Sequence, residues 1–334
     1  MIEARSPIEI GWIPYLNLVP FYCELRRLTG DSIKFASGHP SVVSRWLTEG
    51  RVHLAPASSI SLIKADNLRI PFPLGIASEG PVYSVYIGLH PEHAAFWNYV
   101  RSRQSALADF FHHKLQRMDL QDLVQSSGRD GSSMASFADV PELLLTPASA
   151  ASAALTEILL HIWCGRDRAF KILSSAKNNA SKAMTNRVVG SRPMELVIGD
   201  EALRRRHEFW KVLDLGQVWN ELTRLPFVFG LWQSSYAHLP AKLFEAINEA
   251  AAIAQARMQI EPDVYFPEIA PLADDGSLID LKTYWSAIQY KLTKRHLKSL
   301  TVYFNLYKQI SDHDDGSFSR KMMSLNGENF ASIL

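Results

Sequence analysis

The side chains in this sequence that could take part in binding or catalysis are small polar groups. They lie in or just after apolar, strand-like segments, or at the start of a helix. They are one amide and five hydroxyls: Asn17, Ser58, Ser59, Ser84, Ser149 and Ser152. In open α/β sheets, ligands bind beyond the carboxyl ends of the strands. A serine at a helix start adds backbone N–H groups and the positive end of the helix dipole. The set therefore predicts a site for a small carboxylate, which needs no formal positive charge.

Each of these residues also has a purely structural interpretation. Ser58, Ser59 and Ser152 have the residue type and position of helix caps. Asn17 has the residue type of an ordinary turn. Ser84 differs because it lies within the apolar run VYSVYIGL, where a buried hydroxyl must find a hydrogen bond. An inward-facing functional role is favoured for Ser84, whereas both interpretations stay open for the others.

The common catalytic signatures are absent from the sequence. It contains no GxGxxG after a strand, no P-loop, no HExxH, no CxxC and no GxSxG. His112 and His113 occupy consecutive helical positions, which do not share a face, so a solvated surface is favoured over a metal site. Asp200 and Glu201 form either a general-base pair or a helix start with a capping aspartate, and the second is favoured. We assign no metal ligand.

Composition argues against a nucleic-acid-binding, membrane or secreted protein. The 334 residues carry 35 Lys and Arg against 34 Asp and Glu, so net charge gives no reason to expect nucleic acid or an acidic membrane as partner. No apolar run reaches the ~20 residues of a membrane helix, and the N-terminus does not resemble a secretory signal. Cys23 and Cys164 are expected to be buried thiols rather than a disulfide. These features predict a soluble, cytoplasmic protein.

The elements that position the polar residues alternate between strand and helix. Residues 8–13 are typical of a buried strand and 20–28 of the helix after it. The spacing of apolar residues predicts a second helix over 40–50, and a short strand over 51–59 follows it. This strand–helix–strand order indicates an α/β fold.

The later part of the chain continues this pattern with one interruption. Strands are predicted over 82–89, 195–199 and 225–233, and one basic helix over 200–213. Beyond the last of these strands the chain is predicted to be mainly helical. Residues 91–142 interrupt the alternation with a helix and a Gly/Ser-rich loop, so they are interpreted as an insertion.

Six stretches of the sequence, taken in order, resemble one protein family. They are IGWIPYLNLVPF, HPSVVSRWLTEGRVHLAPASSI, GPVYSVYI, SAASAALTEILL, LVIGDEAL and DLGQVWNELTRLPFVFGLW. The family is that of the chorismate dehydratases of the futalosine route to menaquinone. The resemblance covers nearly the whole chain outside 91–142 and about 166–192.

The resemblance implies a two-lobed type II periplasmic-binding-protein-like α/β fold, with two hinge-crossing strands and C-terminal helices. Lobe one would comprise about 1–83 plus 234–334, and lobe two about 84–233. The helical and loop insertion at about 91–142 would belong to lobe two. Fold alone does not imply an enzyme, because this architecture also serves pure binding proteins.

The resemblance also implies an activity, which is that of a hydro-lyase. Chorismate would lose water to give 3-[(1-carboxyvinyl)oxy]benzoate, with no metal or organic cofactor. Asn17 and Ser84 match the family's polar pair beside the reacting ring and would be catalytic. The carboxylates of the substrate would be bound by four serines: Ser58, Ser59, Ser149 and Ser152.

Some positions depart from the family pattern, and other functions stay open. Ala151 replaces a usual Thr, Ser44 a common Asn and Arg224 a common Gly. One alternative is a non-catalytic binder of a small aromatic carboxylate, and another is a diverged paralogue. A third is the sister enzyme 1,4-dihydroxy-6-naphthoate synthase, whose His base has no counterpart in the loop containing Asn17. The sequence does not specify an oligomeric state.

Overall fold

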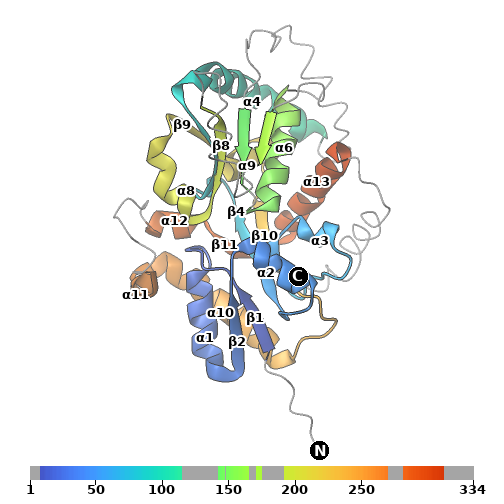
Figure 1. Cartoon of the computed structure of the whole chain (residues 1–334), viewed down its shortest axis with the longest axis vertical. Helices are drawn as coiled ribbons and strands as arrows, with labels where there is room; N and C mark the ends of the chain where they lie inside the picture. Colours follow the sequence, from blue (N-terminus) through green and yellow to red (C-terminus); the bar gives the residue numbers. More distant parts are fainter. Residues whose placement is uncertain are drawn as a thin grey trace, which may run out of the picture. The chain divides into compact units, whose positions relative to one another are not determined.

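A computed structural model describes residues 8–114, 142–146, 148–164, 171–174, 192–269 and 281–311 (Figure 1). The described chain divides into two compact units. Unit 1 contains residues 8–78 and 228–297, and unit 2 contains residues 79–227 and 298–311. Both units are α/β, which confirms the predicted fold class.

Unit 1 contains a two-stranded sheet, β2-β1, and a four-stranded sheet, β3-β10-β4-β11. β1 and β2 are parallel, and β10 runs antiparallel to β3. β1 joins the rest through the parallel bridge between Ile10 and Leu54, just before β3. The strands are β1 (Ile8–Trp12), β2 (Ile33–Ser37), β3 (Ala55–Ser58), β4 (Leu74–Ser78), β10 (Phe227–Gln233) and β11 (Gln289–Lys291).

A glycine in β1 allows this sheet to pack closely. A Cβ atom at Gly11 would lie 2.6 Å from Val43 Cγ1 and 2.8 Å from the Ala55 side chain, so a larger residue would separate β1 from its neighbours. The helices of unit 1 are α1 (Val19–Thr29), η1 (Gly30–Ser32), α2 (Pro40–Thr48), α3 (Ser61–Lys64), α10 (Ala241–Ile260), η5 (Pro262–Tyr265), α11 (Phe266–Ile269) and α12 (Leu281–Ala287).

A buried charge holds α1 to α10. The Glu24 side chain is 2 % exposed and binds Arg257 Nη1 at 2.9 Å, while the Tyr265 hydroxyl donates to it at 3.0 Å. A buried carboxylate needs such partners, and Arg27 Nη2 adds a second cation 2.6 Å from Glu24 Oε2. This network fixes the helix that follows the Asn17 loop.

The sheet of unit 2 has the order β7-β6-β8-β5-β9. β6 is parallel to β7 and β8, whereas β5 is antiparallel to β8 and β9. In unit 1 the four strands β2-β1-β3-β10 have the same pattern as β7-β6-β8-β5, with β10 in the place of β5. In each unit this antiparallel strand is the first one formed after the chain arrives from the other unit. The strands are β5 (Val85–Leu89), β6 (Glu142–Leu145), β7 (Lys171–Ser174), β8 (Met194–Ile198) and β9 (Lys211–Asp214).

The helices of unit 2 include most of α13, which is bound to the unit by two buried hydrogen bonds. Tyr303 donates to the Ala151 carbonyl at 3.0 Å, and Trp219 Nε1 donates to Ser299 Oγ at 2.9 Å. The helices are η2 (Pro91–His93), α4 (Ala94–Lys114), α6 (Ala150–Cys164), α8 (Gly199–Arg205), η4 (Arg206–Glu208), α9 (Leu215–Thr223) and α13 (Lys294–Ile310).

The prediction of one helix over 200–213 is wrong. α8 ends at Arg205, and Lys211–Asp214 form β9, which pairs along β5 from Tyr86 to Leu89. The Phe209 ring packs against Gly88, where a Cβ atom would lie 2.4 Å from the ring. Pairing with a strand more than a hundred residues away overrides the local helical pattern. Beyond β10 the described chain is mainly helical, as predicted, and the short strand β11 lies between α12 and α13.

Two other predictions concern regions that the structure covers only in part. α4 accounts for the helical start of the predicted insertion at 91–142, and residues 115–141 lie outside the described part. Cys23 and Cys164 form no disulfide in the described chain, but both are partly exposed, so the expectation that they are buried is wrong.

Candidate functional site

The loop that carries Asn17 connects β1 to α1 in unit 1 and has a fixed backbone. Within the loop, Leu18 N donates to the Tyr15 carbonyl at 2.9 Å. Two buried aromatic side chains bind the next carbonyls: Trp285 Nε1 donates to Leu16 O at 2.9 Å, and the Tyr290 hydroxyl donates to Asn17 O at 2.7 Å. The position of Asn17 is therefore set before any ligand binds.

The side-chain oxygen of Asn17 is left without a partner. Asn17 Oδ1 is buried and accepts no hydrogen bond from any described residue. An unsatisfied buried polar atom costs about 1–3 kcal/mol, and native structures contain few of them. A purely structural turn residue would have its oxygen bonded to the loop. This observation favours the functional interpretation of Asn17.

Ser58 and Ser59 also have hydroxyls without partners. They lie at the end of β3, where Ser59 N donates to the Phe229 carbonyl at 3.1 Å. Both Oγ atoms are buried and form no hydrogen bond within the described chain. Neither caps the helix that follows, because the residue at the N-cap of α3 is Ile60. The structural interpretation of these two serines as helix caps is therefore wrong.

The three unpaired groups of unit 1 follow two neighbouring strands. β1 and the segment entering β3 run in the same direction, as the parallel bridge between Ile10 and Leu54 shows. Asn17 follows β1, Ser58 ends β3 and Ser59 comes directly after it, so these residues lie beyond the same edge of the sheet. This is the edge at which α/β sheets bind ligands.

Ser84 of unit 2 lies in a tight turn rather than in a strand, because β5 begins one residue later at Val85. Its side chain is 1 % exposed. Ser84 N donates to the Val82 carbonyl at 2.7 Å, and the Ser84 carbonyl accepts from Gly199 N at 2.7 Å. Tyr83 has a φ of +63°, which is unusual for a residue with a side chain.

The carboxylate of Asp214 holds this turn in place. It accepts hydrogen bonds from Tyr83 N at 2.7 Å and from Val82 N at 3.1 Å. It also caps α9 by accepting from Gln217 N at 3.1 Å. Burial raises the pKa of the Asp214 carboxyl, whereas these backbone donors act in the opposite direction. Sequence reasoning did not single out Asp214, although an aspartate before an apolar helical pattern signals a cap.

We expect Asp214→Ser to loosen the turn around Ser84 while keeping α9 capped. A serine still accepts from Gln217 N but is too short to reach the other two donors. Two buried N–H groups then lose their acceptor, so the free energy of unfolding should fall by about 1–3 kcal/mol. Amide exchange at residues 82–84 should accelerate, as measured by hydrogen exchange with mass analysis. Unchanged exchange at these residues would refute the role of Asp214 in holding the turn. Asp214→Asn keeps one acceptor oxygen, so its loss of stability and its exchange rates should be intermediate.

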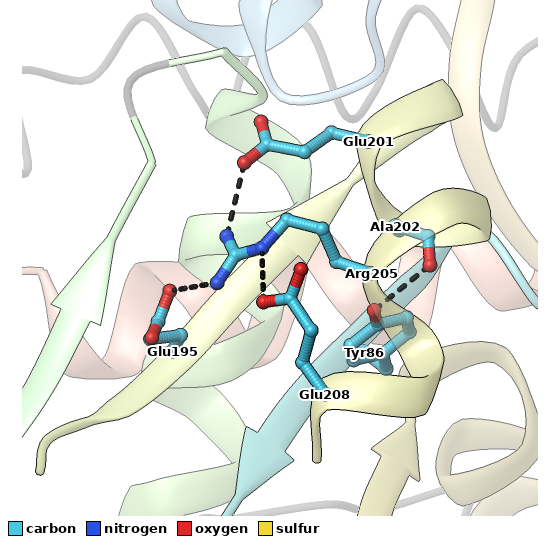
Figure 2. A network of polar contacts seen from close by, with 6 residues as sticks. All are labelled: Tyr86, Glu195, Glu201, Ala202, Arg205 and Glu208. Atoms are coloured by element: carbon cyan, nitrogen blue, oxygen red, sulfur yellow. Dashed lines mark hydrogen bonds and ion pairs between the residues drawn. The ribbon is translucent and has the colours of Figure 1, made fainter. Parts of the chain in front are cut away.

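A cluster around Arg205 joins α8 to β8 (Figure 2). Arg205 binds Glu195 of β8, Glu201 and Glu208, each at 2.9–3.0 Å. Glu201 thus forms an exposed ion pair within its own helix, which does not support its assignment to a general-base pair. Next to this cluster, the Tyr86 hydroxyl donates to the Ala202 carbonyl at 2.8 Å.

Ser149 and Ser152 contact each other at the start of α6. Ser149 Oγ accepts from Ser152 N at 3.2 Å and lies 2.9 Å from Ser152 Oγ. Ser149 is therefore the capping residue, rather than Ser152 as the alternative interpretation had it. The side chain of Ala151, between them, is fully buried. Capping accounts for the geometry of this pair, and a role in binding carboxylates remains a prediction.

The described part of the chain has neither a metal-binding cluster nor a membrane-spanning helix. No three His, Cys, Asp or Glu side chains there gather closely enough to hold a metal ion. No helix in those ranges has the length and apolar character needed to cross a membrane.

The fold and its duplicated strand order define a class of protein. Protein AF1704 from Archaeoglobus fulgidus is similar at a TM-score of 0.58 and 14% identity, covering 90% of this chain and 96% of that one. A Candida albicans gene product described as having the generic periplasmic binding protein fold gives 0.56 and 11%, covering 96% and 95%. The alkanesulfonate-binding protein SsuA from Xanthomonas axonopodis pv. citri gives 0.54 and 12%, covering 92% and 96%.

These similarities identify a two-domain, periplasmic-binding-protein-like fold. A family model described as menaquinone biosynthesis matches residues 8–93 and 107–309. The chain therefore belongs to the menaquinone biosynthesis family.

Proposed function

We propose that this protein is a chorismate dehydratase, which removes water from chorismate to give 3-[(1-carboxyvinyl)oxy]benzoate. Membership of the menaquinone biosynthesis family supports a role in that pathway. The observation that carries the finer proposal is the set of buried, unpaired groups in unit 1: Asn17 Oδ1, Ser58 Oγ and Ser59 Oγ. Neutral hydroxyls and an amide suit a substrate with two carboxylates and a hydroxyl.

This reaction needs few catalytic groups from the protein. Conjugation with the ring carboxylate acidifies the C3 hydrogen of chorismate, and loss of that proton with the C4 hydroxide leaves an aromatic ring. The proton and the hydroxide together make the water that departs. Aromatisation supplies the driving force, so the protein has to orient the ring and stabilise developing charge.

The proposal gives each polar residue a role. Asn17 and Ser84 orient the enolpyruvyl carboxylate of the substrate, which serves as the base, or assist the departing hydroxyl. The hydroxyls of four serines bind the substrate carboxylates: Ser58, Ser59, Ser149 and Ser152. The turn held by Asp214 keeps the Ser84 hydroxyl in place during the reaction.

We expect the purified protein to convert chorismate into a product lighter by one water, measured by mass analysis. The proposed mechanism uses the substrate's own carboxylate as the base and assigns no metal ligand, so dialysis against EDTA should leave the rate unchanged. A sample without protein is the control, because chorismate also decomposes slowly by itself. Binding of chorismate without turnover would contradict the proposal and favour a carboxylate-binding protein. Neither binding nor turnover would favour the sister enzyme 1,4-dihydroxy-6-naphthoate synthase.

A further inference from the structure

Gln233 is a fully buried amide whose donor group is directed at the turn that carries Ser58 and Ser59. It is the last residue of β10, and its side chain is 0 % exposed. Gln233 Nε2 donates to the Ser58 carbonyl at 3.0 Å and lies 3.3 Å from the Ala57 carbonyl. A third acceptor, Ser61 Oγ, lies at 3.4 Å.

The orientation of this amide follows from its partners. With the amide flipped, Gln233 Oε1 would face two carbonyl oxygens, and acceptors do not bond acceptors. The NH₂ group must therefore face the turn. Oε1 then has no donor among the described residues, although it is buried.

These bonds engage the Ser58 carbonyl, a backbone acceptor in the same turn as the two unpaired serine hydroxyls. The Ser58 carbonyl accepts from Gln233 Nε2 and also from Ser61 Oγ at 2.5 Å, so both of its lone pairs are engaged. Serine hydroxyls readily bond to nearby backbone carbonyls when these are available. With this carbonyl saturated, the hydroxyls of Ser58 and Ser59 remain buried and unpaired.

We propose that Gln233 is a positioning residue that fixes the turn after β3 and keeps the Ser58 and Ser59 hydroxyls available to substrate. Part of this inference rests on the proposed function, because those hydroxyls are assigned to the carboxylates of chorismate. Gln233 itself acts through the turn and is not assigned a contact with substrate.

The test uses Gln233→Met, which keeps the length of the side chain but removes its donors. Gln104→Met is the matched control, since Gln104 is 6 % exposed, donates to a backbone carbonyl, that of Val218, and has an unpaired Oε1. We expect Gln233→Met to raise KM for chorismate about tenfold or more, with kcat within about threefold of wild type. Gln104→Met should leave both constants within about twofold of wild type.

A second readout does not depend on chorismate. Hydrogen exchange at the amides of residues 59–65 should be about tenfold faster in Gln233→Met, and unchanged in Gln104→Met. If the wild-type protein makes no product, the proposed function fails. Hydrogen exchange still tests whether Gln233 fixes the turn after β3. Unchanged exchange in Gln233→Met overturns the inference. Faster exchange with an unchanged KM overturns its link to substrate binding.

Discussion

Replacing Ser84 with alanine is expected to lower kcat for chorismate dehydration by about a hundredfold or more. Removing one well-placed donor from a developing negative charge has an effect of about 10²–10³. The turn itself should survive, because its bonds to the Val82 carbonyl and from Gly199 N are made by the backbone. The bonds that the Asp214 carboxylate accepts from Val82 N and Tyr83 N also remain. The backbone of the turn should therefore persist while the rate falls.

A buried serine in the same unit provides the control. Ser299 is 1 % exposed, as is Ser84, and accepts from Trp219 Nε1 at 2.9 Å. Ser299→Ala leaves that indole N–H unpaired, so the free energy of unfolding should fall by about 1–3 kcal/mol with kcat unchanged. Single-turnover rates and thermal unfolding of both variants separate the two effects. A Ser84→Ala protein with wild-type kcat would remove Ser84 from the proposed catalytic pair.

Local sequence patterns predict the part of the site that follows from strand ends. Asn17, Ser58 and Ser59 were singled out because they follow apolar segments, and ligands bind beyond such strands. The structure places all three beyond one edge of the sheet and leaves their side-chain oxygens unpaired. That last property depends on every neighbour of each atom, so no local pattern reveals it.

The residues that sequence reasoning missed act across long separations. Asp214 binds the backbone at Val82 and Tyr83, and Gln233 binds the backbone at Ser58. Each pair lies more than a hundred positions apart in the chain, so the contact exists only after the sheets have formed. β9 was mistaken for helix for the same reason, because its pairing with β5 decides its conformation. Local helix or strand propensity predicts conformation poorly where a segment can pair with a distant strand.

The second large effect is expected from Asn17→Ala, in which activity and stability should move in different directions. Loss of the amide should lower kcat for chorismate about a hundredfold or more, because the group that orients the reacting carboxylate or the leaving hydroxyl is gone. The free energy of unfolding without ligand should stay within about 1 kcal/mol of wild type or rise, since the deleted Oδ1 is an unpaired buried acceptor. Denaturant unfolding and steady-state kinetics measure the two quantities.

The backbone of the same loop supplies a control with the opposite pattern. Tyr290→Phe removes the hydroxyl that donates to the Asn17 carbonyl at 2.7 Å but leaves the Asn17 amide in place. The free energy of unfolding should fall by about 1–3 kcal/mol, because a buried carbonyl loses its donor, and kcat should fall much less than in Asn17→Ala. Asn17→Ala would then lose activity but not stability, and Tyr290→Phe would lose stability but little activity. This outcome would mean that the loop tolerates an unpaired oxygen because a ligand uses it, as in other sites where function opposes stability. If Asn17→Ala lost stability and activity together, Asn17 would be a structural turn residue, and catalysis would have to rest on Ser84 alone.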